Sequence, residues 1–327
     1  MKNIQRASVI ALLIGLVAPA AASAAEDAAY PTKPVRMVIP YPPGGGSDHV
    51  GRQMAQKLSA SLGQTVIPDN RAGAAGTIGA DQVAKSPPDG YTILLGGSST
   101  MAVSPSLYEK LPFDSLRDFA AVTMLVIVPN VLVVHPSLPV SSVGDLIKLG
   151  KKRPKELNFG SQGNGSVGHL SGAMLKVLAG IDITHVPYKG ASPAITALMS
   201  GEVQMLFDSP FSAMPHVKSK RLRALGVSSV KRMPIAPQLP TIAESGVPGF
   251  EAGIWYALFA PARTPRPIVD RLYRESGNAL RSPDMRDMFL GQGAEIVAST
   301  PEEFSAYLKN DIARWAKIIK AAGVRAD

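Results

Sequence analysis

The sequence predicts an α/β protein with two lobes, in which mainly parallel sheets are flanked by helices. From about Tyr30 onward, short runs of β-branched and apolar residues alternate with amphipathic stretches, a rhythm typical of βαβ units. The rhythm restarts at Asn130, which indicates a second unit of the same kind. The chain has 327 residues, 46% of them hydrophobic, and is therefore long enough for two domains of about 150 residues each.

Residues 1–24 are predicted to be a secretory signal peptide. Lys2 and Arg6 give a positively charged start, residues 7–17 form an apolar run, and cleavage is expected after Ala24. This apolar run is too short to span a bilayer, which needs about 20 residues. The chain contains no cysteine, which fits an exported protein whose core needs no disulfide and excludes thiol catalysis and iron–sulfur clusters.

The first βαβ unit is the clearest. Residues 35–40 form a predicted strand, and a loop rich in proline and glycine follows. Asp48 is expected to cap the next helix, whose apolar residues recur every four positions from Val50 to Leu62. The last helix is predicted from a capping box at residues 300–303 and from an apolar stripe that indicates a packing face.

The remaining elements follow from the same alternation. Further strands are expected at residues 92–95, 131–134, 157–160, 183–187, 203–207, 223–227, 255–259 and 295–298. Further helices are expected at residues 76–85, 143–152, 168–179, 192–200, just after 210, 267–280 and 285–290. The strand after Pro129 and the strand at Trp255 are natural crossovers, so residues 30–129 with 253–327 are predicted to form lobe 1 and residues 130–252 lobe 2.

Two glycine-rich loops, at residues 40–48 and 160–169, each join a strand end to a helix start. Glycine lets main-chain N–H groups point inward without a Cβ in the way, and a helix N-terminus carries partial positive charge. Each loop can therefore hold a carboxylate or phosphate without lysine or arginine. Two such anion-binding loops facing each other suggest a dicarboxylate ligand.

Other chemistries fit less well. Gly163, Gly165 and Gly168 match G-x-G-x-x-G, but a dinucleotide site expects an acid at the end of the next strand, and Asp182 precedes that strand. No G-x-S-x-G hydrolase motif occurs, and the five histidines lack metal-ligand spacing. The basic residues are dispersed and aromatic residues make up only 6%, which argues against nucleic acid.

Several side chains flank the two loops and are candidates for a pocket wall. Tyr41 lies in the first loop and Tyr188 follows a strand of the second unit. Asp208 ends a strand, where α/β sheets place their ligands, although a turn-capping role before Pro210 is an equal alternative.

Motifs from Tyr30 to the C-terminus occur together in one order and spacing. They are Tyr30-Pro31-x-Lys33-Pro34, Pro40-Tyr41-Pro42-Pro43-Gly44-Gly45-x-x-Asp48, Pro88-Asp89-Gly90-Tyr91-Thr92, Asn158-Phe159-Gly160-Ser161 through His169-Leu170, and Val186-Pro187-Tyr188-Lys189-Gly190. In these motifs the chain resembles the extracytoplasmic solute-binding receptors of tripartite tricarboxylate transporters, the Bug-type or TctC-like proteins.

The resemblance implies a flytrap-like periplasmic binding protein in which the C-terminal tail returns to lobe 1. We therefore expect a receptor that performs no catalysis, binds a small carboxylate between the lobes and delivers it to membrane permease subunits. We also expect it to be a monomer without cofactor or metal. The resemblance also implies ligand-binding roles for Tyr41, Gly45, Gly46, Ser47, Asp48, Ser98, Ser99, Ser161, Gly165, Ser166, Val167, His169 and Asp208. Tyr188 is added from the pocket argument above.

Two alternatives remain open from sequence. An exported α/β enzyme acting on a carboxylate would use the same cleft, although the sequence shows no assembled acid–base set. An orphan receptor that signals ligand occupancy would have the same fold. If Gly45→Pro left carboxylate affinity unchanged in a folded protein, the anion-binding loop hypothesis would be wrong.

Overall fold

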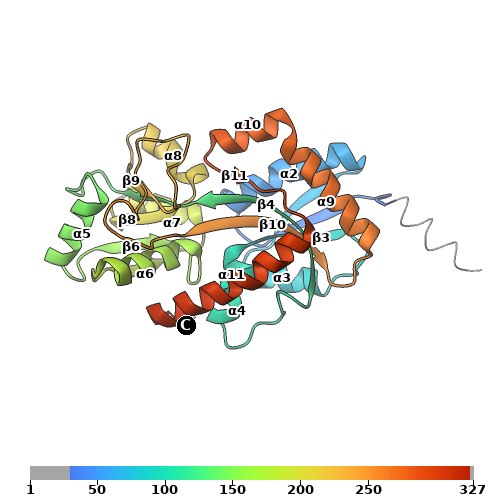
Figure 1. Ribbon diagram of the computed structural model, residues 1–327, viewed down its shortest axis with the longest axis horizontal. Coiled ribbons are helices and arrows are strands. Elements are labelled where there is room, and N and C mark those ends of the chain that lie inside the picture. The colour runs from blue at the N-terminus through green and yellow to red at the C-terminus, as the bar shows by residue number, and fades with distance from the viewer. Residues whose placement is uncertain (1–29, 325–327) are drawn as a thin grey trace, which may run out of the picture.

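The computed structural model describes residues 30–324 and consists of two α/β lobes side by side (Figure 1). One sheet has six strands in the order β11-β4-β10-β3-β1-β2, and the other has five in the order β7-β6-β8-β5-β9. We call the part built on the six-stranded sheet lobe 1 and the other part lobe 2. The predicted signal peptide lies outside the described residues.

Lobe 1 is formed by the two ends of the described chain. Its strands are β1 (Val35–Ile39), β2 (Val66–Asn70), β3 (Thr92–Gly97), β4 (Phe119–Pro129), β10 (Gly253–Pro261) and β11 (Glu295–Ile296). Its α-helices are α2 (Gly46–Leu62), α3 (Thr77–Ala84), α4 (Ser104–Leu107), α9 (Arg266–Arg281), α10 (Pro283–Gly291) and α11 (Pro301–Ala322). A 3₁₀ turn, η1 (Ala74–Gly76), precedes α3, and a π-helical turn, η2 (Ser99–Val103), follows β3.

Lobe 2 is formed by the middle of the chain. Its strands are β5 (Val131–Val134), β6 (Asn158–Ser161), β7 (Thr184–Pro187), β8 (Met205–Asp208) and β9 (Arg223–Val227). Its helices are α5 (Val143–Lys152), α6 (Val167–Ala179), α7 (Ala191–Met199) and α8 (Pro210–Lys218). Short strand-to-helix connections place the starts of α6, α7 and α8 next to the ends of β6, β7 and β8.

The chain crosses between the lobes along β4 into β5 and returns along β10, as the green and orange strands in Figure 1 show. We propose the domain boundaries 129/130 and 252/253 on this basis, because the strands change sheet there. β1 pairs parallel with β2 and β3, and β6 pairs parallel with β7 and β8. The sheets are mixed, however, and the expectation of mainly parallel sheets is corrected: β5 and β10 pair antiparallel because they run away from the cleft toward which β8 and β3 run.

The predicted helix patterns are confirmed by burial. Val50, Met54 and Leu58 on α2 have no exposed surface, and the helix ends at Gly63 with φ of 71°. The capping box of α11 is present, with Thr300 accepting from Glu303 N–H and the Glu303 carboxylate accepting from Thr300 N–H. Trp315 on its apolar stripe is fully buried. These contacts fasten the C-terminal helix to lobe 1.

Three local expectations were wrong. The helix α2 begins at Gly46, so Asp48 is a residue of its first turn and not its cap. The strand expected at residues 92–95 extends through Gly97 as β3, and the π-helical turn η2 follows it. The strands β2 and β4 were not expected.

Candidate functional site

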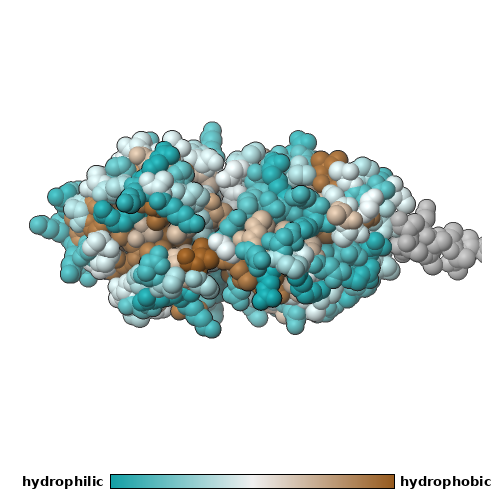
Figure 2. Space-filling view, turned by 90° about the horizontal axis from the view of Figure 1, so that it is seen from above, coloured by the Kyte–Doolittle hydropathy of each residue, from teal (hydrophilic) through white to brown (hydrophobic). Residues whose placement is uncertain are grey.

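A cavity of about 570 Å³ lies between the lobes. Figure 2 shows the notch that separates the two lobes at the surface. The walls of the cavity come from the loop after β1, the segment around η1, the turn at η2 and β10 in lobe 1, and from the ends of β6, β7 and β8 in lobe 2. The cavity therefore lies where the carboxyl ends of the sheet strands meet, the usual ligand position in α/β folds.

The helices α2, α6, α7 and α8 all begin at the cavity wall. All four N-cap residues line the cavity, and they are Gly45, Ser166, Gly190 and Ser209, respectively. The first N–H groups of a helix have no partner within the helix, and the helix dipole adds partial positive charge there. The cavity thus collects main-chain donors from both lobes.

The first anion-binding loop is held in shape by Asp48. Its carboxylate accepts from the Gly44 N–H at 3.1 Å and from the side chains of Arg52 and Asn70 at 3.0 Å each. Burial raises the pKa of Asp48, but the hydrogen bonds from Arg52, Gly44 and Asn70 outweigh it and hold the pKa below its ordinary value. Asp48 is therefore an ionised brace of the loop, and it does not line the cavity.

Tyr41 forms part of the cavity wall with its hydroxyl already engaged. The hydroxyl lies 2.5 Å from the Thr100 hydroxyl and accepts from the Thr100 N–H at 3.2 Å. Thr100 in turn donates to the Ala75 carbonyl at 2.9 Å. Tyr41 therefore ties the first loop to the turn at η2 and to the segment around η1.

The second anion-binding loop is braced by a pair of stacked histidines. The rings of His169 and His185 are 3.8 Å apart with an interplanar angle of 5°. Gly165 N–H donates to His169 Nδ1 at 3.2 Å, and the Ser161 hydroxyl lies 2.6 Å from His185 Nε2. Burial, followed by the neighbouring His169, lowers the pKa of His185 to about 3, so His185 is neutral at physiological pH.

One hydrogen bond connects the lobes at the wall of the cavity. The N–H of Val167, the first residue of α6, donates to the hydroxyl of Ser99 at 3.2 Å. A Cβ on Gly44 would lie only 2.9 Å from the Ser192 hydroxyl of lobe 2. The two lobes are thus in contact at two places, next to Val167 and next to Gly44.

Asp208 lines the cavity at the end of β8 and is only 3% exposed. One carboxylate oxygen accepts from Gln162 Nε2 at 3.1 Å and from the Ser209 N–H at 2.8 Å, and the other accepts from the Ser212 hydroxyl at 2.8 Å. Burial raises the pKa of Asp208 to about 6 in spite of these hydrogen bonds. Asp208 thus caps the turn before α8 and faces the cavity at once.

The structure separates the predicted site residues into two groups. Those lining the cavity are Tyr41, Gly45, Gly46, Ser47, Ser99, Ser166, Val167, Tyr188 and Asp208. Those outside its lining are Asp48, Ser98, Ser161, Gly165 and His169. The Tyr188 hydroxyl donates to Glu202 at 2.7 Å, so the phenol is engaged within lobe 2. Ligand-binding roles for all of these residues stay predictions.

Some residues that line the cavity were not predicted from the sequence. The additional lining residues include Gln162, Lys189, Ser209, Ile254, Tyr256 and the segment 72–76. Segment 72–76 follows β2, a strand that was not expected. β10 is apolar along its whole length, so no local pattern singles out Ile254 and Tyr256.

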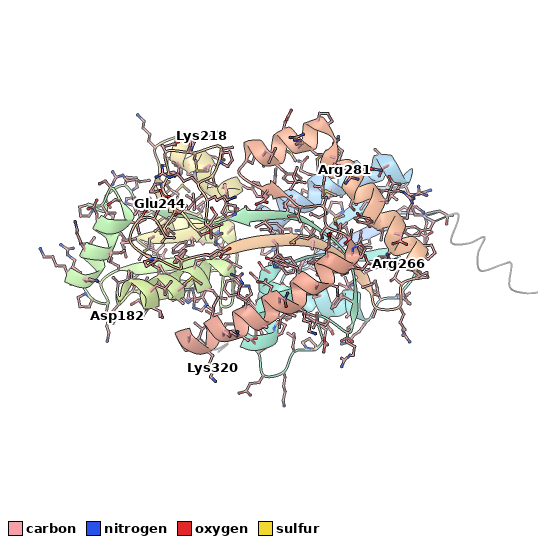
Figure 3. The ribbon with its side chains drawn as sticks, in the orientation of Figure 1. Asp182, Lys218, Glu244, Arg266, Arg281 and Lys320 are labelled. Carbon is pink, nitrogen blue, oxygen red and sulfur yellow. The ribbon has the colours of Figure 1, made fainter. Side chains whose placement is uncertain are left out.

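The charges in the cavity are few. Among the described lining residues, only Lys189, which is exposed, and Asp208 are charged. The ion pairs Lys176–Asp182 and Arg266–Glu302 lie elsewhere on the surface (Figure 3). Within residues 30–324, no three side chains of a metal-binding type are grouped, and no helix is long and apolar enough to cross a membrane.

Fold and site together define a two-lobed α/β binding protein with its cavity between the lobes. Residues 50–324 match the family model TctC, described as the tripartite tricarboxylate transporter family receptor. The chain belongs to this family of receptors, and it is not an enzyme. The predicted alternative of an exported enzyme finds no support in the comparisons.

Relatives cover nearly the whole chain. Protein BugT of Bordetella pertussis is 39% identical over 319 residues, which are 97% of each chain. The solved structure of R. palustris Rpa4515 with adipate has a TM-score of 0.88 and 39% identity, covering 90% of this chain and 99% of the other. MatC from Rhodopseudomonas palustris with bound malate has a TM-score of 0.84 and 31% identity, covering 89% and 100%.

Proposed function

We propose that this receptor captures a small organic carboxylate between its lobes and delivers it to the permease subunits of a tripartite tricarboxylate-type transporter. The observation that supports this most is the convergence of the N-termini of α2, α6, α7 and α8 on one cavity. Main-chain N–H groups and helix dipoles favour a bound anion there without a buried cation.

The arrangement of these N-termini favours a ligand with two carboxylates. The start of α2 lies against α7 and α8, since a Cβ on Gly45 would lie 3.7 Å from the Ala191 Cβ and a Cβ on Gly46 would lie 3.2 Å from the Ser209 hydroxyl. The start of α6 lies against Ser99 instead. A dicarboxylate can place one charge at each group of donors, and adipate and malate, the ligands named with two related structures, are dicarboxylates.

The protein acts in the periplasm as a monomer in this proposal. The predicted signal peptide at residues 1–24 supports export. Ligand binding favours the closed arrangement, because only that arrangement brings the donors of both lobes to one ligand. The closed receptor is then the form that the permease recognises.

A thermal-shift screen of the mature protein tests this function. The panel contains adipate, malate, the monocarboxylate hexanoate and the diamide adipamide, and each stabilising compound is recovered and analysed for conversion. A ligand that binds only the folded state raises its stability. We expect a dicarboxylate to raise the Tm and to be recovered unchanged. Stabilisation by adipamide but by none of the acids would contradict the proposal.

A further inference from the structure

The hydroxyl of Tyr256 lies at the cavity and has no hydrogen-bond partner among residues 30–324. Tyr256 lies on β10 beside a register shift against β4, and its side chain is only 5% exposed. The hydroxyl is directed at the start of α2, because a Cβ on Gly46 would lie 2.7 Å from the Tyr256 oxygen. Gly46 and Tyr256 both line the cavity.

Of the three other tyrosines that line the cavity, two are bonded through their hydroxyls to described residues, and the third, Tyr108, is only partly buried. Tyr41 pairs with Thr100, and Tyr188 donates to Glu202. No residue between 30 and 324 offers the Tyr256 hydroxyl such a bond. Tyrosine hydroxyls in the interior of a protein normally have a partner. The Tyr256 oxygen keeps some accessible surface, and this surface opens into the cavity. The Tyr256 O–H group is therefore an unused hydrogen-bond donor, and a partner for it can bind in the cavity.

The groups around the Tyr256 hydroxyl determine which kind of hydrogen-bond partner it can have. Burial first, then Tyr41 and Asp208, raise the pKa of Tyr256, so its hydroxyl keeps its proton and can donate. Both oxygens of the nearby Asp208 already accept from Gln162, Ser209 or Ser212. The acceptor for this hydroxyl can be supplied by the ligand. A ligand oxygen that accepts from Tyr256 would also lie next to the first N–H groups of α2.

We propose that Tyr256 is a ligand-binding residue whose hydroxyl donates to the carboxylate bound at the N-terminus of α2. This inference rests on the proposed function and deepens it. A side-chain donor is thereby added to a site otherwise built from main-chain groups. Because a carboxylate is a stronger acceptor than an amide oxygen, the Tyr256 hydroxyl favours the acid over its amide.

Tyr256→Phe tests the role, because it removes only the hydroxyl oxygen. Adipate and malate are titrated into wild type and variant by calorimetry, and the comparison uses the tighter ligand of the two. We expect the Kd to rise about 10-fold or more, as for the loss of a charge-assisted hydrogen bond. The Tm of the ligand-free variant should be nearly unchanged, because the hydroxyl opens into the cavity and gives up no hydrogen bond to another described residue.

Tyr30→Phe is the matched control. The Tyr30 hydroxyl is also buried, but it donates to the Gly90 carbonyl at 2.7 Å, outside the cavity lining. This control should lower the Tm of the ligand-free protein and leave the Kd unchanged.

The inference is overturned if Tyr256→Phe binds within about two-fold of wild type, or if it loses ligand-free stability as Tyr30→Phe does. Failure of wild type itself to bind either acid would instead overturn the proposed function together with this inference. The two failures are thus distinguishable in one series of titrations.

Discussion

The Ser228 hydroxyl accepts a hydrogen bond from the main-chain N–H of Asn130 at 2.7 Å, and this bond lies between the two crossovers that join the lobes. The Ser228 N–H donates back to the Asn130 carbonyl at 2.9 Å. On its other side, Ser228 bonds Ala252 through both the hydroxyl and the main chain. Ser228 thus fastens the outgoing and returning chain segments to each other.

Ser228→Ala should lower the free energy of unfolding by about 1–3 kcal/mol, because the buried Asn130 N–H and Ala252 carbonyl lose a partner. Ser276→Ala is the control, since Ser276 is fully buried in lobe 1 and its hydroxyl has no hydrogen bond to any residue that the structure describes. Urea denaturation of both variants measures the difference. Equal losses in the two would show that the bonds of Ser228 carry no special stabilisation.

Gly46→Ala should weaken binding of the dicarboxylate at least about 10-fold. A Cβ there would lie 2.7 Å from the Tyr256 oxygen and 3.2 Å from the Ser209 hydroxyl, so it would hold the lobes apart at the start of α2. Gly144→Ala, whose Cβ would meet its nearest neighbour at 3.7 Å, should bind as wild type does. Calorimetric titration of both variants gives the comparison, and unchanged affinity in Gly46→Ala would refute the close approach of the lobes.

Asp208 should make stability fall as pH rises from about 4 to about 6. Its pKa is raised from 3.8 to about 6 in the folded protein, so in this window the unfolded chain has lost the proton and the folded chain retains it. In Asp208→Asn this contribution is absent. The difference in unfolding free energy, wild type minus variant, should therefore decrease by about 3 kcal/mol across the window. A difference that is flat with pH in urea titrations would contradict the raised pKa.

The local patterns of the sequence were sufficient for most helices, because apolar spacing and capping residues act within a few positions. The structure has α5 at Val143–Lys152 and β9 at Arg223–Val227, as predicted. β4 was not expected, since its apolar run continues directly toward β5 with only Asn130 between them and offers no turn to mark a boundary. Its antiparallel partner β10 is more than a hundred residues away, and pairing over that distance leaves no local pattern.

The candidate site likewise has parts that local sequence patterns predict and parts that depend on long-range contacts. The glycine loops could be located because each stands between a strand and a helix, and residues of both loops line the cavity. The role of Asp48 as a brace depends on contacts with Arg52 and Asn70 that only folding creates. Tyr256 lies on the returning strand, so its place beside Gly46 could be derived only from the tertiary structure.

A crystal structure of the mature protein with bound dicarboxylate would test the central claim most directly. The account predicts one ligand carboxylate within hydrogen-bond distance of the main-chain N–H groups of Gly46 or Ser47, and the other at the start of α6. A ligand held instead by Lys189 at the rim, or bound outside the cavity between the lobes, would contradict it.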